Sequence, residues 1–273
     1  MPKLTHDQIE FNYRDNGSGI PFVFQHGLGA DVNQTFGIFR PPSGFRLLSF
    51  DCRAHGETRP VGNPEKIGIA AFADDLGALM DCLKIERAII GGISMGAAIA
   101  LNFALRFSER AMGLVLSRPA WLDGPRPDNV TVFAQIAQLI RQHGARRGRE
   151  EFLKSDTYAK IRSELPDTAN SLLNQFNHPR AEETVVKLER IPGDAPNRDL
   201  GELARIRVPT LVLANRLDPI HPFEYGEVLA RSIPGAEFKE ITSKSVSIER
   251  HESEVQHAVA DFLERRFAIR LNG

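Results

Sequence analysis

Short apolar runs recur along the chain, and each of them ends at a polar or glycine-rich turn. A run of about four to eight such residues between turn signals is typical of a buried strand. The runs that we interpret as strands are 9–13, 21–25, 46–50, 88–92, 114–116, 210–214 and 237–241.

Other stretches carry their apolar residues with the period of a helix, which predicts helices with one buried face. These stretches are 69–83, 97–107, 223–233 and 248–267. The stretch 97–107 is apolar almost all round, so we expect its helix to be buried. Because strands and helices alternate, the pattern predicts the α/β class, with a parallel sheet covered by helices on both faces.

The segment 122–204 breaks this alternation. It is more polar than the rest of the chain, mostly helical in pattern, and interrupted by glycines and prolines. We interpret it as a helical cap inserted between two strands of the sheet. The predicted division is a core domain formed by 1–121 and 205–273, and a cap formed by 122–204.

Composition narrows the classes of function. The formal net charge of the 273 residues is −1, so no excess charge attracts the protein to nucleic acid or to an anionic membrane. No apolar run approaches the roughly 20 residues that span a bilayer, and the polar start of the chain does not resemble a secretory signal. The two cysteines give neither a disulfide framework nor a metal cluster. We therefore expect a cytoplasmic protein with a small-molecule substrate, while the oligomeric state stays open.

The segment 92–96 has the sequence Gly-Ile-Ser-Met-Gly and lies between a predicted strand and a predicted helix. This is the context of a nucleophile elbow, in which a sharp turn raises a serine hydroxyl above the edge of a sheet. Such a turn needs small neighbours, and Gly92 and Gly96 meet that requirement. We predict that Ser94 is a nucleophile; the plainer interpretation is a glycine-rich turn with an incidental serine.

Three further segments complete a family pattern. The segment 24–29 resembles the His-Gly oxyanion loop of the α/β-hydrolase superfamily, and 51–58 resembles its D-x-R-G-H-G-x-S turn, with Ala54 and Thr58 as departures. The segment 215–222 resembles the loop that carries the acid of the catalytic triad. The resemblance implies the α/β-hydrolase fold, a mostly parallel sheet of about eight strands flanked by helices, with an inserted helical cap.

The resemblance also implies roles for individual residues. The backbone N–H groups of Leu28 and Met95 would form the oxyanion hole, and Asp218 would be the acid that orients a histidine. An Asx-turn at Asp218 is compatible with that role. The resemblance implies no metal and no cofactor.

The catalytic base is where the chain departs from the family. The superfamily usually keeps its histidine just after the last strand, and here Lys244 or Ser245 stands at that place. His251 would preserve the usual order of serine, acid and histidine along the chain. His221 lies three residues after Asp218, at a position that commonly lines the pocket in related enzymes. Both histidines stay candidates, whereas Lys244 would need strong desolvation to lower its pKa.

Two residues are candidates for contact with the substrate. Trp121 precedes the insertion and is a candidate pocket wall, although plain hinge packing explains it equally well. Arg118, like Lys244, should lie near the carboxyl edge of the sheet. If either points inward, it favours a substrate with a carboxylate or another anion; a solvated or paired cation is the alternative.

The resemblance therefore implies hydrolysis of a small carboxylic ester or lactone through an acyl-enzyme intermediate. The same superfamily includes C–C bond hydrolases, which the sequence does not separate from esterases. The departure at the histidine leaves one more alternative, a weakly active or inactive relative that binds a small molecule.

Overall fold

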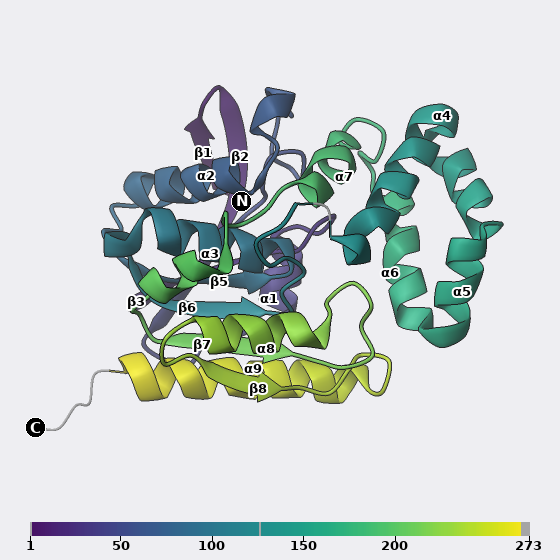
Figure 1. Ribbon diagram of the computed structural model, residues 1–273. Coiled ribbons are helices and arrows are strands. Elements are labelled where there is room, and N and C mark those ends of the chain that lie inside the picture. Colours follow the sequence, from purple (N-terminus) through teal and green to yellow (C-terminus); the bar gives the residue numbers. More distant parts are fainter. Residues whose placement is uncertain (1, 126, 269–273) are drawn as a thin grey trace, which may run out of the picture.

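The computed structural model describes residues 2–125 and 127–268, and its centre is an eight-stranded sheet (Figure 1). In chain order the strands are β1 (Lys3–His6), β2 (Ile9–Gly17), β3 (Ile20–Gln25), β4 (Phe45–Phe50), β5 (Ala88–Ile93), β6 (Ala111–Ser117), β7 (Thr210–Ala214) and β8 (Glu237–Glu240). Their order in the sheet is β1-β2-β4-β3-β5-β6-β7-β8. β2 pairs in the antiparallel direction with β1 and β4, and the remaining pairs are parallel. The predicted mostly parallel sheet is confirmed.

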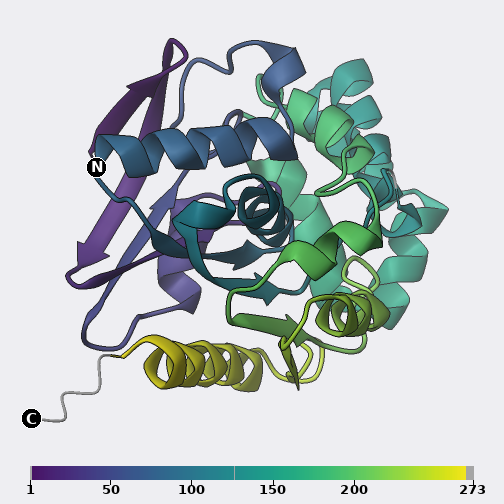
Figure 2. The ribbon, with the colours of Figure 1, turned by 60° about the vertical axis from the view of Figure 1, so that its left-hand side comes forward.

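Alternating side chains along the strands give the sheet two buried faces. In β5, Ile90 packs into one hydrophobic cluster and Ile89 into a second one. Burial of apolar surface contributes about 25 cal/mol per Å², so both clusters stabilise the fold. The first face is covered by α2 (Ile69–Cys82), α3 (Met95–Arg106) and α8 (Phe223–Ser232), and the second by α1 (Val32–Ile38) and α9 (Ile248–Phe267) (Figure 2).

The stretch between β6 and β7 contains four α-helices in the described part of the chain. They are α4 (Thr131–Leu153), α5 (Asp156–Glu164), α6 (Pro166–Asn177) and α7 (Val186–Arg190). Figure 1 shows them together on the side toward which the β6 arrow points. We call the segment 122–204 the helical insertion; its division from the core as a separate domain stays a prediction.

The helices differ in regularity. α4 is interrupted at Gly144, whose φ of 76° and ψ of 167° are not helical. Short 3-10 helices occur at Pro64–Lys66, Ser108–Arg110, Asp128–Val130, Ile191–Gly193 and Leu200–Arg205. Across the described ranges, no helix combines the length and the apolar character needed to cross a membrane.

Two buried basic side chains of the helical insertion bond to carbonyl groups of the turn that follows β4. Arg180 Nη1 donates to the carbonyl oxygens of Gly56 and Thr58, at 2.8 and 2.9 Å. Lys187 Nζ donates to the carbonyl oxygen of Ala54 at 3.1 Å. Both side chains are buried, and losing such a bond would leave a buried polar group without a partner. These contacts therefore fasten the insertion to the core.

Candidate active site

Ser94 occupies a strained turn between β5 and α3. Its φ of 55° lies in the left-handed region, which costs a residue with a side chain on the order of 1–2 kcal/mol. The turn is crowded: a Cβ at Gly96 would lie 2.2 Å from the carbonyl oxygen of Gln25, and one at Gly92 would lie 2.3 Å from the carbonyl carbon of Gly96. The two glycines therefore permit the backbone form that a nucleophile elbow requires.

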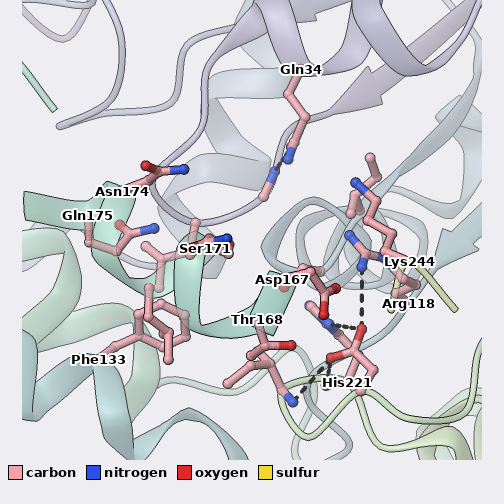
Figure 3. Close-up of a pocket in the computed structure, with 18 of the residues that line it drawn as sticks. Gln34, Arg118, Phe133, Asp167, Thr168, Ser171, Asn174, Gln175, His221 and Lys244 are labelled. Atoms are coloured by element: carbon pink, nitrogen blue, oxygen red, sulfur yellow. Dashed lines mark hydrogen bonds and ion pairs between the residues drawn. The ribbon is translucent and has the colours of Figure 1, made fainter. Parts of the chain in front are cut away.

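Ser94 lies in the wall of a cavity of about 360 Å³. Figure 3 shows side chains that line this cavity. Its walls come from helices α1, α4, α6 and α9, from the end of β5 and the turn after it, and from the loops after β3, β6, β7 and β8. Loops after parallel strands meet at one edge of the sheet, which brings these distant segments together. The site residues predicted from the sequence that line the cavity are Leu28, Ser94, Arg118, Asp218 and His221.

Asp218 and His221 form a hydrogen-bonded pair in the wall of this cavity. His221 Nδ1 lies 2.9 Å from Asp218 Oδ2. The other carboxylate oxygen, Oδ1, accepts the backbone N–H groups of Ile220 and His221, each at 3.2 Å. A carboxylate only accepts hydrogen bonds, so this network assigns the proton to Nδ1 and the lone pair to Nε2.

Burial and nearby charges set the protonation states of this pair. Burial lowers the pKa of His221, and the Arg118 and Lys244 cations act in the same direction, against the Asp218 carboxylate. Burial alone would raise the pKa of Asp218, but His221 and Arg118 hold it well below its ordinary value. Near neutral pH the carboxylate is therefore ionised and the imidazole is neutral, as a general base requires.

His251 has a different environment. It lies in the first turn of α9 with 2% of its surface exposed, and its Nδ1 is 2.8 Å from the carbonyl oxygen of Thr242. Burial lowers the pKa of His251 to about 4, so this ring is neutral and held against the backbone. His251 is not among the residues that line the described cavity. Of the two candidate histidines, the structure brings only His221 to the cavity that holds Ser94.

The loop between β3 and α1 is held by polar contacts. The N–H group of Gly27 donates to Gln34 Oε1 at 2.8 Å. His26 is fully buried, and its Nε2 accepts the backbone N–H of Cys52 at 3.1 Å. His26 therefore supports the loop, and it is not among the residues that line the described cavity.

Both predicted oxyanion donors belong to segments that meet at Ser94. Leu28 follows the supported loop residue Gly27, and both line the cavity. Met95 is the first residue of α3, where backbone N–H groups have no acceptor within the helix. The positive end of the helix dipole lies at the same place and favours negative charge there.

The two residues that the sequence offers for substrate contact have different positions. Arg118 lines the cavity, and its Nη1 lies 3.3 Å from Asp218 Oδ2, so it is paired with the candidate acid. Trp121 is 2% exposed, packs in the core, and is not among the residues that line the cavity. For Trp121 the structure shows the packing alternative. In the described ranges, no three His, Cys, Asp or Glu side chains are grouped so as to hold a metal ion.

Sequence reasoning missed the polar face of α6. Starting from Asp167 and from Thr168, polar residues recur every three or four positions, which brings them to one face of the helix. That recurrence of amide and hydroxyl residues was the available signal. The polar residues of α6 that line the cavity are Asp167, Thr168, Asn170, Ser171, Asn174 and Gln175.

Comparison with known proteins identifies the family. The family model described as alpha/beta hydrolase fold matches residues 20–245. The chain is 28% identical to the AB hydrolase superfamily protein YisY of Bacillus subtilis, over 85% of this chain and 87% of that protein. It is 25% identical to 3-oxoadipate enol-lactonase 2 of Acinetobacter baylyi, over 96% of each chain.

Solved structures give the same result. The enol-lactonase from Burkholderia xenovorans LB400 has a TM-score of 0.72 and 26% identity, with 96% of this chain and 99% of that chain covered. A thermophilic esterase from Thermogutta terrifontis has a TM-score of 0.73 and 25% identity, with 94% of each chain covered. Because the family model also spans most of the sequence, the chain belongs to the α/β-hydrolase fold family.

Proposed function

We propose that the protein is a serine hydrolase that cleaves a small carboxylic ester or lactone. The observation that carries the proposal is that Ser94 and the hydrogen-bonded pair of His221 and Asp218 line one cavity. Relatives named as enol-lactonases and an esterase support this type of bond as the target.

In the proposed reaction, His221 Nε2 takes the proton of Ser94 Oγ while that oxygen bonds to the carbonyl carbon. The carbonyl oxygen becomes an oxyanion, which the N–H groups of Leu28 and Met95 stabilise. Loss of one such donor typically slows an enzyme by about 10²–10³. The imidazolium then returns the proton to the departing alcohol oxygen, and the acyl group stays on Ser94. A water molecule attacks by the same route and releases the acid.

His221 is proposed as the base because of its position. Its Nδ1–H is held by Asp218, so the ring presents the correct tautomer without a further proton shift. No hydrogen bond joins His221 to the Ser94 hydroxyl in the described chain. Catalytic hydrogen bonds are often long in the free enzyme and shorten when substrate binds. We propose that this bond forms in the complex with substrate.

We propose that the helical insertion serves as a cap. Its helices α4 and α6 contribute Phe133 and the polar residues described above to the cavity wall. A cover of this kind limits the size of the substrate and excludes water during the reaction.

Labelling with a fluorophosphonate probe tests the nucleophile. The probe should label the protein, and Ser94→Ala should abolish labelling, while the exposed serine variant Ser163→Ala should label normally. Absence of labelling in the unmodified protein would instead favour the alternative, a relative that binds a small molecule without hydrolysing it.

The base is tested with p-nitrophenyl acetate. His221→Ala should reduce kcat by at least about 10²-fold, the lower end of what a general base contributes. His251→Ala should change kcat far less, provided that circular dichroism shows an intact fold. The matched control is His257→Ala, an exposed histidine of the same helix α9. The opposite ranking of the first two variants would assign the base to His251.

A further inference from the structure

We infer that Lys244 is the anion-binding group of this cavity and that the substrate carries one carboxylate besides its reacting ester or lactone group. The inference rests on the proposed hydrolytic function and specifies its substrate class. Lys244 or its neighbour Ser245 stands where the superfamily usually keeps its histidine. With His221 proposed as the base, Lys244 is a cation at or next to the position where that histidine is usually found.

Lys244 is a cation inside the cavity without an ion pair. It lines the cavity, it is half-buried, and no carboxylate lies within 4.0 Å of its Nζ among the described residues. The other cation of the wall, Arg118, is already paired with Asp218 at 3.3 Å. An anionic partner stabilises a half-buried ammonium group more than an exposed one, since partial desolvation strengthens the attraction between the two charges. Lys244 is therefore the cation with charge to offer a ligand.

Asp167 limits the number of negative charges that a ligand in the cavity can carry. It comes from α6, lines the same cavity, and its Oδ1 is buried without a hydrogen-bond partner in the described chain. Figure 3 shows Asp167, Lys244, Arg118 and His221 on the same side of the cavity. A first carboxylate would be attracted by Lys244, whereas a second one beside Asp167 would be repelled. The charges thus favour a monocarboxylate.

The α6 part of the wall supports a substrate with polar groups. The face of α6 offers amide and hydroxyl groups, of which Thr168 and Gln175 are buried and would be left unsatisfied by a long alkyl chain. Asn174 and Gln175 lie on the side of the cavity away from Lys244 in Figure 3. The inferred substrate is therefore a short, polar acid whose carboxylate lies at Lys244 and whose ester or lactone lies at Ser94.

Equilibrium binding to the Ser94→Ala protein tests this inference without any need for hydrolysis. The two probes are monomethyl glutarate and its neutral counterpart dimethyl glutarate, at pH 7.5, measured by titration calorimetry. The monoacid should bind roughly tenfold more tightly, the gain expected of one charge-assisted contact. Lys244→Met should remove this preference, and Lys244→Arg should retain most of it. Lys239→Met, at an exposed lysine of β8, should leave it unchanged.

Removal of the negative charge of Asp167 provides a second test in the same binding experiment. Asp167→Asn should raise affinity for the monoacid several-fold and leave dimethyl glutarate unaffected, because it removes a competing anion near Lys244. Equal affinity for the two probes, or a preference that survives Lys244→Met, would overturn the inference. Because binding is measured without the nucleophile, the binding test and the labelling test are independent. A negative binding result would overturn the role of Lys244 and would not affect the proposed hydrolysis. Absence of labelling would contradict the proposed hydrolysis and would not affect the binding result.

Discussion

His221 Nδ1 lies 2.9 Å from Asp218 Oδ2, and only two residues separate His221 from Asp218 in the sequence. The acid and the proposed base therefore come from one turn. The same turn is closed by the backbone N–H groups of Ile220 and His221, which both bond to Asp218 Oδ1. The orientation of the imidazole thus depends on local backbone geometry more than on the docking of a distant loop.

The first prediction concerns the acid. Asp218→Asn should lower kcat by about 10³–10⁴, because an amide can donate to Nδ1 and so hold the imidazole in the wrong tautomer. The measurement is kcat on p-nitrophenyl acetate, with circular dichroism to verify the fold. A loss below tenfold would mean that Asp218 does not orient the base.

The second prediction concerns pH. The proposed base works only when it is neutral, so kcat/KM should fall on acidification through the pKa of His221. Burial lowers that pKa from its ordinary value of 6.5, so the pH at which kcat/KM falls to half of its maximum should lie below 6.5. Lys244→Met should move this midpoint upward, because it removes a cation that disfavours the imidazolium.

The pH profile is best measured on neutral p-nitrophenyl acetate, so that carboxylate recognition does not enter. Lys244→Arg, which keeps the charge, should leave the midpoint in place. A midpoint that stays fixed in Lys244→Met as well would show that Lys244 does not act on the titrating group.

The third prediction concerns the buried lysine that fastens the helical insertion. Burial lowers the pKa of Lys187 from 10.5 to about 7. Between these two pH values the unfolded chain binds more protons at this residue than the folded protein does, so the free energy of unfolding should rise with pH. The slope should approach about 1.4 kcal/mol per pH unit.

Urea unfolding at pH 7, 8 and 9 measures this effect as the difference between the unmodified protein and Lys187→Met. That difference should grow with pH in favour of the unmodified protein. The exposed lysine variant Lys160→Met, on α5, should give a constant difference. A constant difference for Lys187→Met would contradict the stated titration.

The fourth prediction concerns the turn at the nucleophile. Gly96→Ala should destabilise the fold by about 2–3 kcal/mol and abolish labelling of Ser94, because its Cβ would lie 2.2 Å from the backbone oxygen of Gln25. Gly37→Ala is the matched control: it lies in α1 with nothing within 4 Å of an added Cβ. It should stabilise the protein by about 0.5–1 kcal/mol, as alanine does in a helix. Thermal unfolding compares the two.

The sequence pattern located most of the sheet, but it missed two elements at the start of the chain. β1 has the largely polar sequence Lys-Leu-Thr-His and is formed by pairing with β2. α1 has only seven residues and begins where the Asp31 side chain accepts the N–H of Asn33. Elements this short depend on neighbours and caps, so a local periodicity cannot reveal them.

For the site, local chemistry and tertiary packing contributed different parts. The turn at Ser94 and the loop at Asp218 are recognisable from sequence because their requirements are local: glycines around a tight turn, and a polar loop after a buried strand. That the polar face of α6 lines the cavity and that Arg118 pairs with Asp218 could not be predicted, since both depend on which segments meet at the edge of the sheet.

By itself the sequence determined the α/β sheet, the serine turn and two possible histidines. Only the tertiary structure separated those histidines: it places His221 in the wall of the cavity with Ser94, and packs His251 against the carbonyl of Thr242. The physical reason is that a hydrogen bond and a cavity depend on distances in space, which the order of residues along the chain does not give.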